Sequence, residues 1–263
     1  MTRGDASEFS LAVISDAHVH DIEGDYGVPG VPAGTRRLSL QTWAHSREST
    51  RVYNESASAF EAALHEVVAR NIRHVVLLGD YTDDGQRETT QRLAERLSKH
   101  EARYGTRFYA LPGNHDIFGP AGRHQSRFLL RSDGSSVRVT SDDRDPPPDS
   151  VVSPAMYCEG YPIGLVPMAR HGYFRRPEDL LWETPFGQDD RPDARTYEVG
   201  SEDGENRYRL MDASYLVEPE PGLWLLMLDA NVFEPRNGVF RRGSKRAFVD
   251  STAAGWNAVL RLK

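Results

Sequence analysis

Hydrophobic residues gather in short runs that alternate with helix-like segments through the first half of the chain. Continuous apolar runs at 9–15, 74–78 and 107–111 have the length and composition of buried strands. Between them, 56–70 and 86–103 carry apolar residues at intervals of three and four, which predicts two amphipathic helices. Strand, helix, strand, helix and strand with short connections predict an α/β fold with a mostly parallel sheet.

The middle of the chain has a looser pattern. The stretch 132–150 has no aromatic residue, Leu or Ile, so we predict a flexible loop there. Aromatic residues scattered between Pro and Gly turns over 151–215 predict irregular structure. We therefore expect a single domain over 1–263 that contains an irregular insertion or cap over 119–215.

Regular structure is expected to return near the end of the chain. The run LWLLMLD at 223–229 predicts a strong buried strand. The stretch 248–263 is expected to begin a further helix, because Trp256, Val259 and Leu260 fall on one side of it.

Composition narrows the class of protein. The 263 residues are 27% charged and 38% hydrophobic, which is typical of a globular enzyme, and no apolar stretch approaches the length of a membrane span. A lone Cys158 excludes an intrachain disulfide and a Cys-rich metal site. No secretory signal is visible, so the default expectation is a cytoplasmic protein. The net charge of −7 argues against a nucleic-acid partner.

Three polar motifs follow the first three predicted strands. They are Asp16-Ala17-His18, Gly79-Asp80-Tyr81-Thr82-Asp83 and Gly113-Asn114-His115-Asp116. In a parallel sheet the strands end at one edge, where ligands bind. Carboxylates brought together there repel unless a cation neutralises them, and an imidazole and an amide oxygen suit a divalent metal. Taken singly, the first two motifs are also explained as turns or helix caps.

The three motifs together resemble those of the calcineurin-like metallophosphoesterase superfamily, which are D-x-H, G-D-x-x-D and G-N-H-[DE]. The resemblance covers residues 9–118 well. It implies a β-sandwich flanked by helices, a phosphate-ester substrate and two divalent metal ions, with Mn, Fe, Zn and Mg all open.

The resemblance also implies roles for individual residues. The implied metal ligands are Asp16 and His18 for the first ion, Asp80 as the bridge, and Asn114 for the second ion. His115 is implied as the catalytic histidine near the leaving group, oriented by Asp83. A hydroxide activated by the metals is then expected to attack a phosphomonoester or phosphodiester.

The sequence departs from the family pattern in its second half. The family continues with a histidine after a later strand and a G-H-x-H motif, and the last histidine here is His171. We therefore expect a truncated domain with an incomplete second sheet and fewer ligands for the second ion. His20, His124 and His171 are weak substitutes, because an isolated histidine usually packs or lies at the surface. A scaffold without catalysis and a fragment that binds one metal remain alternatives, and oligomeric state stays open.

Overall fold

The strands predicted in the first half of the chain form a parallel sheet. In the computed structural model β1 (Leu11–Ser15), β4 (His74–Leu78) and β5 (Arg107–Leu111) pair in parallel, as predicted, and their order in the sheet is β1-β4-β5. The strands are short apolar runs, and each ends in the polar loop that carries one of the three motifs. The structure describes residues 9–117, 119, 122–231, 234–235, 237 and 248–249.

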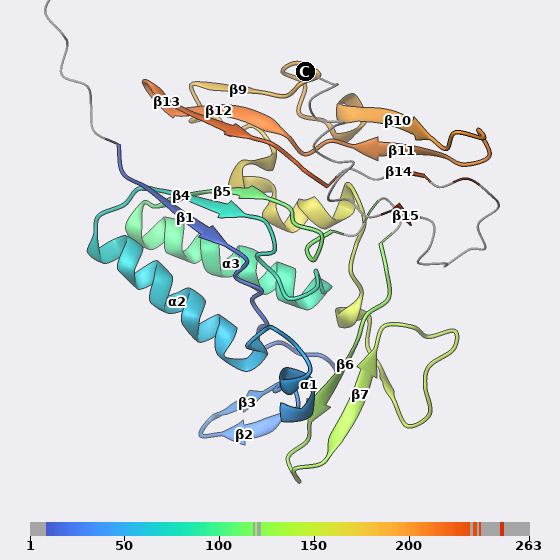
Figure 1. Ribbon diagram of the computed structural model, residues 1–263. Helices are drawn as coiled ribbons and strands as arrows, with labels where there is room; N and C mark the ends of the chain where they lie inside the picture. The colour runs from blue at the N-terminus through green and yellow to red at the C-terminus, as the bar shows by residue number, and fades with distance from the viewer. Residues whose placement is uncertain are drawn as a thin grey trace, which may run out of the picture.

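Two long helices cover one face of this sheet (Figure 1). They are α2 (Tyr53–Ala69) and α3 (Arg87–Tyr104), close to the predicted ranges. Phe60, Leu64 and Val67 recur at helical spacing and give α2 its buried face. None of the helices in the described part of the chain is long and apolar enough to cross a membrane.

A second sheet lies on the other face of the first, which makes the predicted sandwich (Figure 1). Its antiparallel strands, in the order β13-β12-β9, are β9 (Leu181–Glu183), β12 (Tyr215–Glu220) and β13 (Leu223–Met227). Apolar side chains of both sheets belong to one buried cluster. Tyr215 ties the layers together, because its hydroxyl donates to the carbonyl of Ala110 at 3.0 Å.

The predicted flexible loop over 132–150 is wrong in part, because it contains a strand. An additional small sheet has the order β6-β7-β8, with β6 (Ser126–Leu130), β7 (Ser136–Thr140) and β8 (Val151–Val152). Val137 and Val139 alternate inward from β7 and are buried in a separate small core. Two buried valines are sufficient apolar side chains for a strand that pairs with a neighbouring strand. The lack of Leu and aromatic residues over 132–150 therefore did not exclude a strand.

The region from 151 to 215 is also more regular than expected. Besides β9 it contains a hairpin of β10 (Thr196–Gly200) and β11 (Arg207–Met211), whereas 154–173 consists of short helical turns. Those turns are η1 (Pro154–Met156), η2 (Ile163–Met168) and η3 (Ala169–Tyr173), and η4 (Pro192–Arg195) precedes the hairpin. The remaining short elements are β2 (Val31–Ala33), β3 (Arg36–Leu38), α1 (Trp43–Arg47), β14 (Glu234–Pro235) and β15 (Phe248–Val249). Beyond β15, the helix expected over 248–263 lies outside the described residues.

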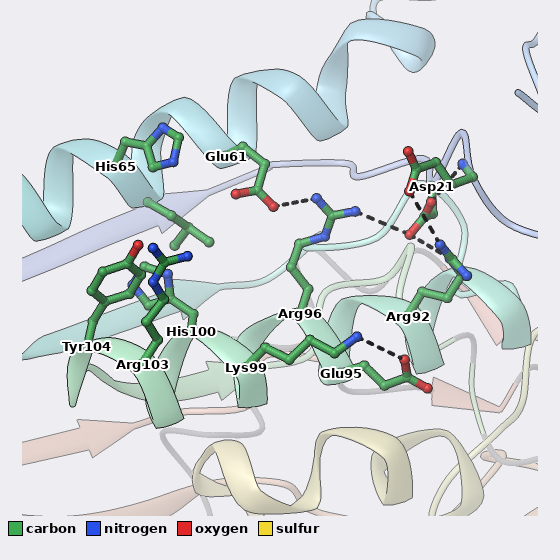
Figure 2. Close-up of a pocket in the computed structure, with 12 residues that line it drawn as sticks. Asp21, Glu61, His65, Arg92, Glu95, Arg96, Lys99, His100, Arg103 and Tyr104 are labelled. Atoms are coloured by element: carbon green, nitrogen blue, oxygen red, sulfur yellow. Dashed lines mark hydrogen bonds and ion pairs between the residues drawn. The ribbon is translucent and has the colours of Figure 1, made fainter. Parts of the chain in front are cut away.

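A cavity of about 360 Å³ opens between α2 and α3 (Figure 2). Charged side chains line it, and they pair with one another. Arg92 lies 3.0 Å from Asp21, and Arg96 pairs with Glu61. This groove thus has a charge pattern that is largely balanced within the protein.

Candidate metal centre

The loops after β1 and β4 hold three predicted ligands in a strained backbone conformation. Asp16, His18 and Asp80 have φ angles of 51°, 41° and 47°, in the left-handed region that costs a non-glycine residue roughly 1–2 kcal/mol. Hydrogen bonds between the loops keep them there: the His18 amide donates to the Asp80 carbonyl at 2.8 Å, and the Asp16 amide to that of Gly79 at 3.3 Å. Such strain persists where surrounding contacts determine the conformation, and it is common at functional sites.

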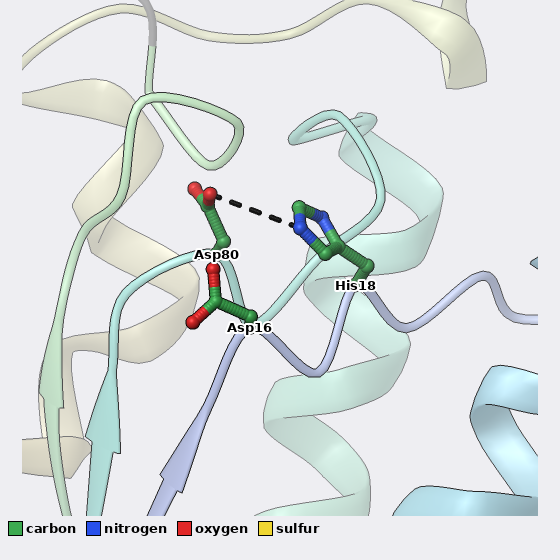
Figure 3. Close-up of side chains that lie close together, drawn as sticks. All are labelled: Asp16, His18 and Asp80. Carbon is green, nitrogen blue, oxygen red and sulfur yellow. Dashed lines mark ion pairs between the residues drawn. The ribbon is translucent and has the colours of Figure 1, made fainter. Parts of the chain in front are cut away.

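The side chains of these three residues converge (Figure 3). Asp16, His18 and Asp80 each offer a ligand atom, and these atoms lie within 4.8 Å of one another. The His18 Nε2 lies 3.8 Å from an Asp80 carboxylate oxygen. Burial lowers the pKa of His18, and the Asp80 carboxylate opposes that effect. Two carboxylates and a neutral imidazole are a donor set that fits a divalent transition metal.

The loop after β5 fits closely against Asp80. A Cβ atom on Gly113 would lie 2.0 Å from Oδ1 of Asp80 and 2.3 Å from its backbone nitrogen, so only glycine allows this approach. The same Oδ1 accepts a hydrogen bond from the His115 amide at 2.9 Å. The Asp80 carboxylate is thereby held between the second and third motifs.

Asp116, the last residue of the third motif, clamps these two loops together. Its carboxylate accepts hydrogen bonds from the Thr82 amide and hydroxyl at 2.8 and 2.6 Å and from the Gly113 amide at 2.8 Å. Burial raises the pKa of Asp116 to about 7. From the sequence, Asp116 was recognised as part of the third motif, but no role was predicted for it.

Asn114 lines the same cavity as the carboxylates. Together with Asp16 and Asp80 it lines a cavity of about 340 Å³ at the carboxyl edge of the sheet. The geometry therefore brings Asn114 to the edge where it was predicted.

A polar residue that follows β13 also belongs to this cavity and was missed, together with the aspartate that supports it. Asn231 lines it, and its side-chain amide donates to the Pro112 carbonyl at 3.0 Å. Behind Asn231, buried Asp229 accepts a hydrogen bond from the Tyr161 hydroxyl at 2.9 Å, and burial raises the pKa of Asp229 to about 7. The available signal was the same as for the other motifs, namely polar residues directly after an apolar run. The strand in that run, β13, is buried on one face only, not throughout as predicted, because Trp224 and Leu226 are exposed.

His115 lies next to the three clustered side chains. The carboxylate that contacts its ring is that of Asp84, whereas Asp83 was predicted. The His115 Nδ1 is 2.6 Å from Oδ1 of Asp84. Its ring meets the ring of His18 edge-on, with 5.0 Å between centroids. Burial, together with the charge of Arg51, lowers the pKa of His115.

The comparisons with known proteins agree with this geometry. The family model of calcineurin-like phosphoesterases matches residues 9–207, more than half of the chain. The chain belongs to the calcineurin-like phosphoesterase family. Members of this family are hydrolases, and they generally use divalent metals. Among the curated proteins, none matches the chain.

In this chain Asp83 belongs to a buried ionic cluster, and Asp84 is the carboxylate that contacts His115. Oδ1 of Asp83 is 2.7 Å from Nη1 of Arg51, and its Oδ2 is 3.3 Å from Nε of Arg127. Burial alone raises the pKa of Asp83, but the charges of Arg127, His20 and Arg51 outweigh burial and hold that pKa below its usual value. The expectation that Asp83 orients His115 is therefore corrected, because these arginines compete for its carboxylate.

The three alternative histidines lie outside the Asp16, His18 and Asp80 group. His20 is buried with Nε2 at 2.8 Å from the Ser39 carbonyl, and Nδ1 of His124 is 3.1 Å from the Ser141 hydroxyl. His171 is buried with Nδ1 at 3.4 Å from Glu101. Over the described ranges, the Asp16, His18 and Asp80 group is the one cluster with metal-ligand spacing.

Proposed function

We propose that this chain hydrolyses a phosphomonoester or a phosphodiester with the help of two divalent metal ions. The observation that carries this proposal is the convergence of Asp16, His18 and Asp80 within 4.8 Å, beside a histidine held by its own carboxylate. The family assignment supports a phosphate ester as the class of substrate.

The proposed ligands are those that the resemblance implied. Asp16 and His18 would hold the first ion, Asn114 would hold the second, and Asp80 would contribute to both. When bound, the ions supply Lewis-acid polarisation of the phosphoryl oxygens and a nucleophilic hydroxide at neutral pH. The strained loop backbone and the close approach of Gly113 to Asp80 fix the ligands before any ion arrives.

His115 has the proton-transfer role in this proposal. Its Nδ1 is occupied by Asp84, so Nε2 is the nitrogen that can face the substrate. A carboxylate on Nδ1 fixes the orientation and tautomer of the ring and stabilises its protonated form. His115 can thus donate a hydrogen bond to the phosphoryl group or a proton to the leaving oxygen.

The test is metal-dependent hydrolysis of p-nitrophenyl phosphate and bis-p-nitrophenyl phosphate by the full chain with Mn²⁺. We expect turnover that chelation by EDTA removes, and a loss of at least about 100-fold in Asp80→Asn. Asp142→Asn, at a half-buried aspartate that does not line the cavity, is the matched control. A folded wild-type chain that shows no turnover, or equal rates in Asp80→Asn, contradicts the proposal and favours a scaffold without catalysis.

A further inference from the structure

Asn231 lines the cavity at the sheet edge and has no role in the proposed function. It follows β13 of the second sheet, and it shares the cavity with the proposed ligands Asp16, Asp80 and Asn114. Asn231 is 9% exposed, so its side-chain amide is almost out of contact with solvent. A buried amide needs a partner for each of its polar atoms, because an unpaired one costs free energy.

The side-chain nitrogen of Asn231 is directed into the protein. It donates to the Pro112 carbonyl at 3.0 Å, at the start of the loop that carries Asn114. The Tyr161 hydroxyl gives its one proton to Asp229 at 2.9 Å, so it accepts in its hydrogen bond with the Asn231 side chain. The opposite orientation of the amide would set its oxygen against the Pro112 carbonyl oxygen, where two acceptors repel. These contacts therefore fix the amide and use its nitrogen.

The side-chain oxygen of Asn231 is the polar atom that remains for the cavity. The hydrogen bonds of Asn231 within the described residues do not use this oxygen. The other polar side chains that line the cavity also present oxygen atoms, namely those of Asp16, Asp80 and Asn114, and its lining within the described part of the chain contains no arginine or lysine. Carboxylate and amide oxygens that converge without a basic partner suit a hard divalent cation.

The second ion also has fewer proposed ligands than the first. Asp80 and Asn114 are the two side chains assigned to it, and the first ion has three. Neither His18 nor His115 lines this cavity, so the polar side chains of the described residues there offer oxygen and no imidazole nitrogen. Asn231 would add a third oxygen donor where the set is incomplete.

We propose that Asn231 is a ligand of the second ion through its side-chain oxygen. The second site then consists of oxygen atoms from Asp80, Asn114 and Asn231, whereas the first includes the imidazole of His18. Oxygen donors favour hard ions such as Mn²⁺ and Mg²⁺, and imidazole favours Zn²⁺ and Fe²⁺, so the two sites differ in metal preference. This inference rests on the proposed function for the presence of a second ion.

The test is calorimetric titration of Mn²⁺ into the metal-free full chain, with electron paramagnetic resonance of the bound ions. We expect the wild type to bind two ions that give a spin-coupled signal. Asn231→Ala should weaken binding of the second ion by at least about tenfold, while affinity for the first changes less than about threefold. The spin-coupled signal should then give way to that of a single ion.

Asn231→Asp distinguishes a ligand from a residue that only supports the loop. Aspartate keeps the oxygen and adds a negative charge, so a ligand role predicts that the second ion binds at least as tightly as in the wild type. A purely structural role predicts weaker binding, because aspartate cannot donate to the Pro112 carbonyl. Asn71→Asp is the matched control, since it adds the same charge at an exposed residue that does not line the cavity.

Three results of these titrations would overturn the proposal. They are a second-ion affinity that stays unchanged in Asn231→Ala, one that falls equally in Asn231→Asp and Asn231→Ala, and a wild type that binds one ion or none. Asn231→Asp carries the test alone if Asn231→Ala does not fold.

Metal competition in the wild type tests the proposal without a variant. The ratio of Zn²⁺ to Mn²⁺ affinity should be at least about tenfold smaller at the second site than at the first, because the second site has oxygen donors alone. Competition titrations with elemental analysis measure both ratios. Equal ratios at the two sites would contradict a second site made of oxygen donors.

The same measurements separate this inference from the proposed function. Binding of the second ion that depends on Asn231, in a chain that hydrolyses neither p-nitrophenyl ester, supports the ligand and contradicts catalysis. Hydrolysis that depends on Asp80, with unchanged second-ion affinity in Asn231→Ala, supports catalysis and contradicts the ligand.

Discussion

Two cavities of similar size differ in how the protein treats the charges around them. The groove between α2 and α3 is about 360 Å³ and the cavity at the sheet edge about 340 Å³. In the groove, Arg92 pairs with Asp21 and Arg96 with Glu61, and both arginines lie on the regular helix α3. At the sheet edge Asp16 and Asp80 converge on left-handed backbone, and the basic side chain that the described residues place against Asp80 is His18. The two cavities are therefore alike in volume and in having charged side chains. The cavity at the sheet edge differs in its strained backbone and in carboxylates that no arginine or lysine of the described residues neutralises.

The largest effect that would sharpen this contrast is expected from His115→Ala. Removing the proposed acid should lower turnover of the p-nitrophenyl esters by about 100- to 1000-fold. Metal content should stay near that of the wild type, because the ring is not one of the three clustered ligands. Steady-state kinetics with elemental analysis checks both; unchanged turnover would remove His115 from the mechanism.

A smaller but still large effect is expected from Gly113→Ala. The new Cβ would overlap Oδ1 of Asp80, and the Gly113 amide is tied to Asp116, so the Asp80 carboxylate must move. We expect turnover to fall by about 100-fold and Mn²⁺ affinity to fall with it. Gly200→Ala is the control, since its Cβ meets ordinary contact at 3.6 Å. A Gly113→Ala chain that binds Mn²⁺ normally would show that the close approach is not needed.

The neighbouring aspartates Asp83 and Asp84 should separate orientation from stability. Asp84→Asn removes the negative charge that faces Nδ1 of His115 and should lower kcat about 10- to 100-fold. Asp83→Asn removes the fully buried carboxylate that pairs with Arg51 and Arg127 and leaves both with Asp84 alone, so it should lower the free energy of unfolding by about 3 kcal/mol. Chemical denaturation and kinetics of both variants are the measurements. A larger kcat loss in folded Asp83→Asn than in Asp84→Asn would restore Asp83 as the orienting residue.

The smallest effect is expected in the helix groove. Arg96 is 25% exposed and Glu61 is 38% exposed, so Arg96→Gln should cost less than about 1 kcal/mol of stability. Turnover should stay within about twofold of the wild type, because the groove takes no part in the chemistry. Thermal unfolding and kinetics check this, and a strong loss of turnover would break the comparison between the two cavities.

The sequence was most informative where local pattern and tertiary structure agree. The runs at 74–78 and 107–111 are apolar after their first residue, as strands covered on both faces are, and the polar residues after them had to meet at one edge. The strand at 136–140 was not predicted, because its two inward valines are a weak local signal. The strand forms because it pairs with β6. The role of Asp84 was not predicted. Which of the two adjacent aspartates contacts His115 depends on the arginines that bind Asp83, and those come from distant parts of the sequence.

The most direct test of the central claim is the metal content of the full chain after incubation with Mn²⁺ and removal of free ion. One ion per wild-type chain would keep the Asp16, His18 and Asp80 group and remove the second proposed site. The account predicts two manganese ions per wild-type chain, with a marked loss in Asp80→Asn. A folded wild-type chain that retains no metal would contradict it.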